Sequence, residues 1–213
     1  MNQIKKEHWE QVYNSHNPDQ VSWTQPIPQT SLDFIHSFHL PKTSKIIDIG
    51  GGDSRLVDCL LKEGFKNITV LDISAAALKK AQKRLGPDSK LVKWVVADVN
   101  DFKPAEKYDL WHDRATFHFL TAKNEVSSYL GVAGKAVKKY LVIGTFSENG
   151  PEKCSGLPVK QYTEEQLQNQ LTEDFVKIRC INEDHITPLK LNRIFFFVVS
   201  KRNNRQPKQL KFI

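Results

Sequence analysis

The chain has few of the features that cross-link a protein or anchor it in a membrane. Among its 213 residues there are only three cysteines, and no two of them have the C-x-x-C spacing that serves zinc binding or redox chemistry. The first ten residues are polar and lack the apolar core of a secretory signal. The longest apolar run, residues 194–199, is far too short to cross a bilayer. We therefore expect a cytoplasmic protein without a membrane span, a disulfide framework or a metal site.

Acidic residues are absent from the last thirteen positions, which carry five Lys and Arg residues. The formal net charge of the chain is +7, and without residues 201–213 it is +2. The excess positive charge is therefore mainly a property of a basic C-terminal tail. Such a tail could attract an acidic partner or nucleic acid, although a solvated end after the last strand explains it as well. Since no nucleic-acid-binding module accompanies it, we expect no nucleic-acid partner and no obligate protein partner.

Residues 1–200 are expected to form one α/β domain. Hydrophobic residues make up 39% of the chain and charged residues 26%, which is ordinary for a globular protein with one sizeable core. Strand-like apolar runs alternate with segments of helical spacing, which predicts three α-β-α layers around a seven-stranded, mostly parallel sheet. No helix is expected between the last two strands, so the last strand should run antiparallel. The strands are expected at 45–49, 68–71, 91–97, 108–111, 140–146, 176–182 and 194–200, and the helices at 3–14, 32–38, 55–63, 75–85, 123–138 and from 163 onward.

Three consecutive glycines mark the stretch around which the domain is organised. Residues 46–49 contain three isoleucines, as expected of a buried parallel strand. Gly50, Gly51 and Gly52 follow, where the absence of side chains lets the backbone turn sharply and a ligand approach closely. Ser54 can cap the helix that comes next. A strand, a glycine turn and a helix in this order predict a ligand-binding crevice at the carboxyl ends of the strands.

The glycine turn does not fit a dinucleotide. The dinucleotide fingerprint G-x-G-x-x-G requires a third glycine, and Arg55 occupies that position. Asp48 stands just before the turn, where its carboxylate would repel a pyrophosphate. An acid in this position suits a ligand that carries a cationic or hydroxyl-bearing group.

Two further aspartates come at the ends of the second and third strands. Asp72 stands 22 residues after the first of the three glycines, where an acid can accept two hydrogen bonds from ribose hydroxyls. Asp98 could accept a hydrogen bond from an adenine amino group, with Ile73 and Val99 in apolar contact with the ring. Because the carboxyl ends of parallel strands meet at one edge of a sheet, these two acids and Asp48 should share the crevice. A cationic ligand would offset the cost of gathering like charges there.

Four short motifs together carry a family resemblance. They are Asp48-Ile49-Gly50-Gly51-Gly52, Leu71-Asp72-Ile73-Ser74, Ala97-Asp98-Val99 and Tyr108-Asp109-Leu110. In this order they resemble the class I S-adenosylmethionine (SAM) methyltransferases over residues 40–200. The resemblance implies a Rossmann-like sheet, SAM as cofactor and S-adenosylhomocysteine (SAH) as its product.

The first forty residues are expected to form a helical arm. The pattern His8-Trp9-Glu10-x-x-Tyr13 with Trp23 resembles a branch that includes lysine methyltransferases of elongation factor and citrate synthase. This resemblance implies that the three aromatic residues approach the cofactor. The arm could be stapled to the body, or it could lie over the pocket as a lid that excludes water. The expected cofactor-binding residues are Trp9, Tyr13, Trp23, Asp48, Gly50, Gly51, Gly52, Asp72, Ile73, Asp98, Val99 and His112.

The segment after the fourth strand holds the candidates for catalysis. Methyl transfer is an in-line displacement, so the enzyme mainly positions the acceptor and strips water from it. His112 and Asp113 could orient or deprotonate an acceptor, and Arg114 could clamp a carboxylate. A structural ion pair between Asp113 and Arg114 is an open alternative. His118 is expected to pack among aromatic neighbours.

The acceptor is not fixed by the sequence. The Asn/Asp-Pro-Pro-aromatic motif of many amino-group methyltransferases is replaced by residues 112–115, which argues against that chemistry. The short chain and its expected enclosing loops favour a small-molecule acceptor. The arm pattern keeps a protein lysine as the alternative acceptor. A SAM-binding protein without catalysis is a third hypothesis, because no single residue is decisive for catalysis.

Overall fold

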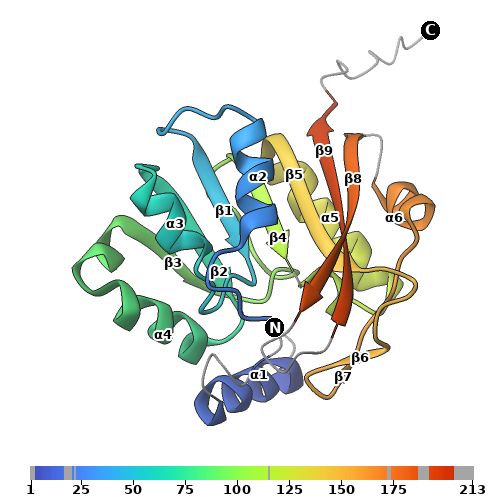
Figure 1. Cartoon of the computed structure of the whole chain (residues 1–213), viewed down its shortest axis with the longest axis horizontal. Coiled ribbons are helices and arrows are strands. Elements are labelled where there is room, and N and C mark those ends of the chain that lie inside the picture. The colour runs from blue at the N-terminus through green and yellow to red at the C-terminus, as the bar shows by residue number, and fades with distance from the viewer. Residues whose placement is uncertain are drawn as a thin grey trace, which may run out of the picture.

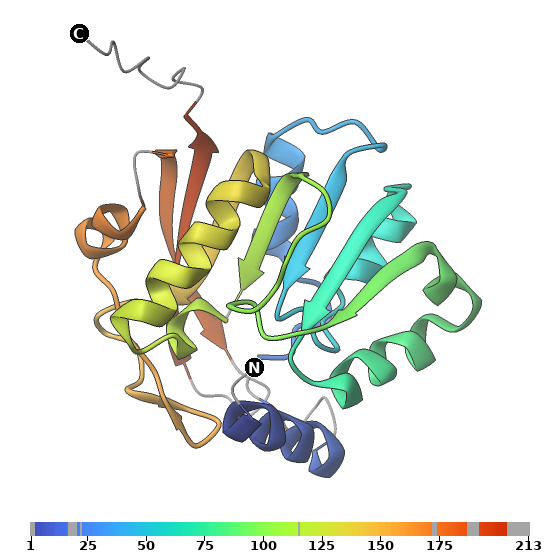
Figure 2. The same ribbon diagram turned by 180° about the vertical axis from the view of Figure 1, so that it is seen from behind.

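A computed structural model describes residues 3–16, 21, 23–114, 116–171, 174–186 and 192–203. Figures 1 and 2 show one twisted sheet between two layers of helices. Its seven strands lie in the order β3-β2-β1-β4-β5-β9-β8, and β9 runs antiparallel to both of its neighbours. The expected three-layer, mostly parallel sheet with an antiparallel last strand is therefore confirmed. The strands are β1 Lys45–Ile49, β2 Asn67–Asp72, β3 Val92–Val96, β4 Tyr108–Arg114, β5 Val137–Phe146, β8 Phe175–Ile186 and β9 Asn192–Arg202.

Successive side chains of the central strands enter two separate hydrophobic cores. Ile46 packs with residues of α2, α3 and α4 on one face, and Ile47 packs with residues of α5 and α6 on the other. Figure 1 shows the first face with α2 in front, and Figure 2 shows the second with α5 in front. Both faces are covered, which explains why the parallel strands are apolar at consecutive positions. The helices are α1 Gln3–Ser15, α2 Gln29–Ser37, α3 Leu56–Lys62, α4 Ala75–Leu85, α5 Lys123–Ala136 and α6 Glu164–Gln170.

The sheet order places the two halves of the fold on either side of a switch point. The chain passes from β1 outward to β2 and β3, and then returns to the other side of β1 with β4 and β5. The crossovers therefore diverge between β1 and β4, which leaves a crevice at the carboxyl ends of these strands. In both views α1 lies across this end of the sheet.

Several elements differ in their boundaries from the expected ones, and β8 extends four residues further than expected, through Ile186. The fourth strand continues through Arg114, since β4 pairs in register with β1 and β5 beyond Trp111. The fifth helix ends at Ala136, directly before β5. The expected loop at 147–161 contains a short hairpin of β6 (Lys153–Cys154) and β7 (Leu157–Pro158). Strands of two residues carry too little periodicity to be recognised in a sequence.

The basic tail begins later than expected. Strand β9 extends through Arg202, whose guanidinium forms an ion pair with Asp174 at 3.1 Å. Lys201 and Arg202 therefore belong to the sheet. The other three basic residues of the expected tail lie outside the described residues.

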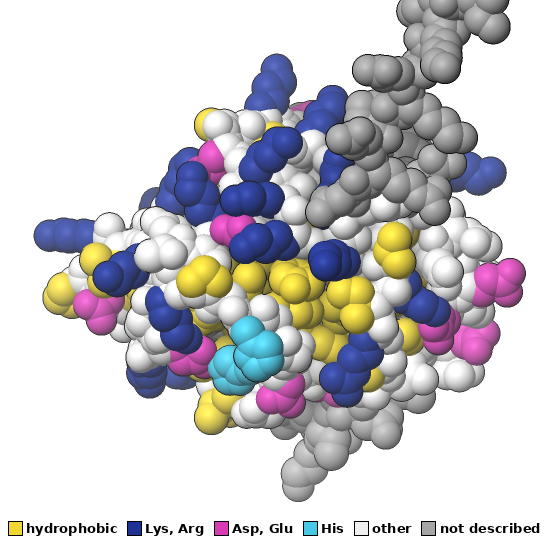
Figure 3. All heavy atoms as spheres, turned by 90° about the horizontal axis from the view of Figure 1, so that it is seen from above, with side chains coloured by type: hydrophobic (Ala, Val, Ile, Leu, Met, Phe, Trp, Pro, Cys, Tyr) yellow, Lys and Arg dark blue, Asp and Glu magenta, His cyan; other side chains and the backbone are white. Residues whose placement is uncertain are grey.

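Lys and Arg side chains gather at the end of the sheet that lies opposite α1, as Figure 3 shows. Two acids at this end each contact two lysines. Glu106 pairs with Lys45 and Lys93, and Asp109 is shared by Lys138 and Lys139. Part of the positive charge thus lies on the domain itself, far from the crevice. In the described part of the chain, no helix has the length and apolar character needed to cross a membrane.

Candidate cofactor and acceptor site

A pocket lies at the carboxyl ends of β1, β2 and β4. Two segments from distant parts of the chain border it, α1 and the hairpin β6–β7, and Figures 1 and 2 show them together at this end of the sheet. A Cβ atom on Gly156, in the hairpin turn, would lie 3.9 Å from the His8 ring of α1. Of the expected site residues, those that line the pocket are Trp9, Tyr13, Trp23, Asp48, Gly50, Gly51, Asp72, Ile73, Asp98, Val99, His112 and Arg114.

The glycine turn leaves no room for side chains. Gly50 and Gly52 have φ angles of +62° and +48°, which favour glycine. A Cβ atom on Gly50 would lie 1.7 Å from Oγ1 of Thr116, and one on Gly51 would lie 2.6 Å from Oδ2 of Asp48. A Cβ atom on Gly52 would lie 2.5 Å from the Tyr13 hydroxyl of the arm. Gly52 does not itself line the pocket, but it lets Tyr13 approach the turn.

Arg84 of α4 fixes the end of the glycine turn. Its guanidinium donates to the backbone carbonyls of Asp53 (2.7 Å) and Ser54 (2.8 Å). It also donates twice to the carboxylate of Asp58 on α3, at 3.0 and 2.8 Å. This bidentate geometry is one that arginine supplies and lysine does not. Arg84 therefore ties α3, α4 and the turn together beside the pocket.

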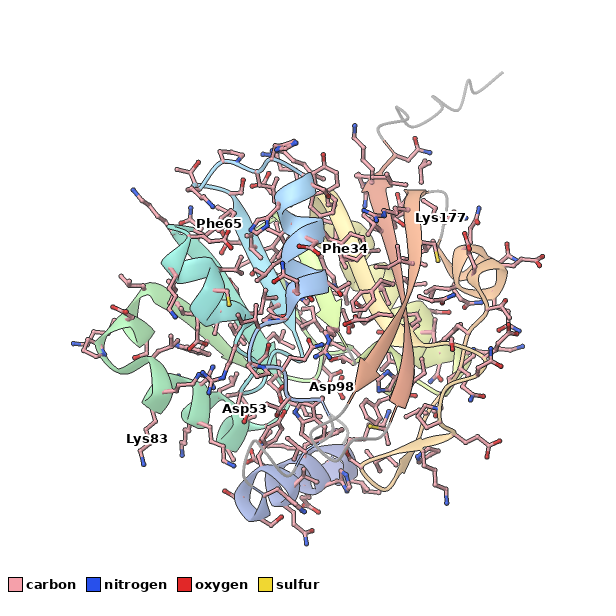
Figure 4. All side chains as sticks on the ribbon, in the orientation of Figure 1. Phe34, Asp53, Phe65, Lys83, Asp98 and Lys177 are labelled. Carbon is pink, nitrogen blue, oxygen red and sulfur yellow. The ribbon has the colours of Figure 1, made fainter. Side chains whose placement is uncertain are left out.

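We expect Arg84→Met to destabilise the fold by about 1–3 kcal/mol, because two carbonyls and a carboxylate lose a charged donor. It should also weaken cofactor binding, since the turn loses its restraint. Lys83→Met is the matched control, because Lys83 neighbours Arg84 but points away from the body in Figure 4. Urea unfolding and calorimetric titration of both variants would check this. Equal affinities in the two variants would show that the turn keeps its shape without Arg84.

Four aspartates line the cofactor side of the pocket: Asp48, Asp53, Asp72 and Asp98. Figure 4 shows Asp53 and Asp98 toward the end of the sheet where α1 lies. Burial is the main reason that the pKa of Asp72 is raised to about 7; the charges of Asp53 and Asp48 add to the rise, and hydrogen bonds from the Ser74 and Gly52 amides oppose it. Burial also raises the pKa of Asp53. A cationic or hydroxyl-bearing ligand would favour the ionised forms of these carboxyls.

The stability of the cofactor-free protein should depend on Asp72 at neutral pH. A folded-state pKa of about 7 exceeds the unfolded value of about 3.9, so the folded state binds more protons between these values. The contribution of Asp72 is therefore complete below pH 4 and is lost as the pH rises through about 7. Relative to wild type, Asp72→Asn should gain stability as the pH is raised from about 5 to 8. Thermal unfolding across this range tests this, with the exposed Asp33→Asn as control; a constant difference would contradict it.

His112 is held by hydrogen bonds at both ring nitrogens. Its Nδ1 lies 2.7 Å from Oδ1 of Asp48, and its Nε2 lies 2.9 Å from the Ser31 hydroxyl of α2. All three side chains are buried. Because a carboxylate can only accept, Nδ1 carries a proton and donates it in a hydrogen bond to Asp48. We therefore expect His112 to orient Asp48 rather than to take a proton from an acceptor directly.

The other two catalytic candidates lie in different environments. Asp113 does not line the pocket; it is fully buried, and its Oδ1 accepts from the amides of Thr116 (2.9 Å) and Phe117 (3.3 Å). Burial raises its pKa to about 7. Arg114 lines the pocket and donates to the Trp23 carbonyl at 3.0 Å. Burial lowers its pKa to about 10, against the charges of Glu183 and Asp48.

Aromatic rings form the other wall of the pocket. Trp9 lies edge-on to Trp23 (5.7 Å between centroids) and to Phe119 (5.0 Å), and Tyr13 lies 5.9 Å from Trp23. His118 lies 4.2 Å from the ring of Phe146 and nearly parallel to it, as expected for a histidine that packs among aromatic residues. This wall combines rings from α1, from the following segment, from the short helix Phe117–Phe119 and from β5.

The sequence had indicated a methyl-transfer fold through motifs that all fall between β1 and β4. A family of methyltransferase domains matches residues 46–139. These residues therefore form a methyltransferase domain. The predicted family and its cofactor, SAM, are thereby confirmed.

Several known proteins resemble the chain. Malonyl-[acyl-carrier protein] O-methyltransferase 1 of Ilyobacter polytropus is 34% identical over 108 residues, which are 48% of this chain and 39% of that protein. The chain thus matches about two fifths of this relative's length. A SAM-dependent methyltransferase of Anabaena variabilis superposes with a TM-score of 0.71, 14% identity and coverage of 93% of this chain and 95% of its own. A structure from work on echinomycin biosynthesis, where a disulfide bond becomes a thioacetal group, has a TM-score of 0.74 at 17% identity and 94% coverage of both chains.

The pocket of this methyltransferase domain fits SAM on its own geometry. The glycine turn is a cradle that any Cβ atom would fill, and the four aspartates suit a ligand with sulfonium and ammonium charges. Asp72, Ile73, Asp98 and Val99 all line this pocket, and their contacts with ribose and adenine stay predictions. Other residues that line the pocket were not indicated by the sequence, among them Ser31, Arg84 and Thr116, which hold His112, the glycine turn and the end of β1.

Proposed function

We propose that the protein transfers the methyl group of SAM to a small-molecule acceptor. The observation that carries this proposal is the enclosure of the pocket by α1 and the β6–β7 hairpin, which approach each other at His8 and Gly156. An enclosed pocket suits an acceptor that enters entirely. The names of the curated relatives support a small reacting group, since those proteins are named for a malonyl unit that an acyl-carrier protein carries.

When bound, SAM supplies a methyl group activated by its sulfonium. The residues of the chain bind the cofactor, orient it toward the acceptor and exclude water from both. Asp48, held by His112, and Asp72 would hold the charged and hydroxyl-bearing parts of the cofactor. The aromatic wall of Trp9, Trp23 and Phe119 would keep water from the reacting centre.

Arg114 would bind an anionic group on the acceptor side of the pocket. Its guanidinium lines the pocket and offers the planar geometry that suits a carboxylate. The carboxylate could belong to the cofactor or to the acceptor. Asp113 would not touch the acceptor. It would act indirectly, because it holds the amides of Thr116 and Phe117 at the start of the short helix that contributes to the aromatic wall.

The experiment is a methyl-transfer assay with labelled SAM. Purified protein is incubated with pools of metabolites, with acylated carrier proteins and with a cell lysate. Labelled small molecules, lost in Asp48→Ala, would support the proposal. Labelled protein lysines would replace it with the lysine methyltransferase alternative. SAM binding without transfer to any acceptor would favour a non-catalytic SAM-binding protein.

We also propose a cytoplasmic location, in keeping with three cysteines that form no disulfide.

A further inference from the structure

Glu10 connects the N-terminal arm to the start of α4. Its Oε1 accepts from the amide of Ala75 at 2.7 Å, and its Oε2 accepts from the amide of Ala76 at 3.0 Å. The Ser74 hydroxyl donates to the same Oε2 at 3.1 Å. The first amides of a helix have no partner within the helix and carry partial positive charge, so a carboxylate is well placed there. Glu10 therefore caps a helix that begins 65 residues later in the chain.

The same short segment also holds a cofactor acid. The Ser74 amide donates to Oδ1 of Asp72 at 2.8 Å, while the Ser74 hydroxyl donates to Glu10. Ser74 thus lies between Asp72, which faces the pocket, and Glu10, which belongs to the arm. If cofactor binding moved Asp72, the movement would reach Glu10, which anchors the arm, through Ser74 alone.

Glu10 also lies between the two aromatic residues that α1 brings to the pocket. Trp9 precedes it, and Tyr13 lies nearly one turn later, with its hydroxyl over Gly52. Burial, with the charges of Asp72 and Asp53, raises the pKa of Tyr13. Anchoring Glu10 therefore sets where both rings lie against the glycine turn.

We propose that Glu10 is a positioning residue that holds the arm closed over the cofactor and couples its docking to cofactor binding. Other contacts hold the ends of α1: Lys5 donates to the Phe119 carbonyl (3.0 Å) and to Glu125 (2.6 Å), and Lys80 donates to the His16 carbonyl (2.6 Å). Glu10 differs from them because its partners adjoin Asp72. This inference rests on the proposed function only in requiring that the pocket binds SAM and SAH.

The test compares Glu10→Ala and Glu10→Gln with Glu7→Ala, an exposed acid whose carboxylate accepts a hydrogen bond from Gln3 of the same helix. SAH dissociation is followed by stopped-flow through the fluorescence of Trp9 and Trp23. Hydrogen exchange of α1 is measured with and without SAH. We expect Glu10→Ala to release SAH about tenfold faster, a factor that corresponds to about 1.4 kcal/mol. SAH should no longer protect α1 in this variant, although it still protects β1 and β2.

Glu10→Gln keeps an acceptor oxygen without the charge, so its release rate should fall between wild type and Glu10→Ala. Glu7→Ala should behave as wild type. A lower melting temperature with unchanged SAH release would make Glu10 a structural cap and overturn the proposal. If Glu10→Ala does not fold, an unchanged release rate in Glu10→Gln overturns it equally. Failure of wild-type protein to bind SAH would instead overturn the proposed function itself.

Discussion

Gly50→Ala is expected to abolish most of the affinity for SAM while the protein still folds. The variant places a Cβ atom 1.7 Å from Oγ1 of Thr116 in a backbone conformation with φ of +62°. A left-handed conformation costs an alanine about 1–2 kcal/mol, and relieving the overlap costs about 1–3 kcal/mol more. Thr116 also donates to the Ile49 carbonyl, so its displacement distorts the end of β1. We expect affinity to fall by about tenfold or more, as measured by calorimetry.

Gly64→Ala is the matched control for this prediction. Gly64 has φ of +84°, and nothing lies within 4 Å of its added Cβ atom. Gly64 is also outside the pocket lining. This variant should lose about 1–2 kcal/mol of stability from the backbone conformation and keep its affinity for SAM. If Gly50→Ala bound SAM as tightly as Gly64→Ala, the glycine turn would not be part of the cofactor site.

Asp72→Ala is expected to weaken SAM binding by about 1–3 kcal/mol, the range for hydrogen bonds to a charged group. The carboxyl is buried and lines the pocket, where it would accept hydrogen bonds from ribose hydroxyls. Asp72→Asn keeps an oxygen that accepts from the Ser74 amide, so it should lose less affinity than Asp72→Ala. Calorimetric titration with SAM and SAH measures both losses.

Asp33→Ala provides the comparison for Asp72. Asp33 is exposed on α2 and accepts a hydrogen bond from Gln29 of the same helix. It should leave SAM affinity unchanged. Wild-type affinity in Asp72→Ala would refute the ribose-binding role of Asp72. It would also contradict the prediction that the strand-end aspartates bind the cofactor.

The sequence was most informative where local pattern decides the structure. The isoleucines of residues 46–49 and the following glycines predicted β1 and its turn, and the periodic segment after Ser74 predicted α4 with the correct limits. The three strand-end aspartates converge because parallel strands place their carboxyl ends together. These features depend on neighbours in the chain or on simple topology.

The parts of the site that were missed depend on contacts between distant residues. Glu10 looks like one of several polar residues on an exposed helix, and nothing nearby in the sequence indicates that it caps α4. Ser31 and His112 are 81 residues apart, so their hydrogen bond could not be anticipated from spacing. Asp113 and Arg114 were paired as sequence neighbours, yet adjacent side chains on a strand point to opposite faces. One therefore enters the core and the other the pocket.

The most direct test of the account is a calorimetric comparison of SAM, SAH, NAD and ATP as ligands of the purified full-length chain. The account predicts micromolar binding of SAM and SAH and no binding of NAD or ATP, because the four pocket aspartates favour a cation and oppose phosphates. Absence of SAM binding by folded protein would contradict the cofactor site and every role assigned to Asp48, Asp72 and Asp98.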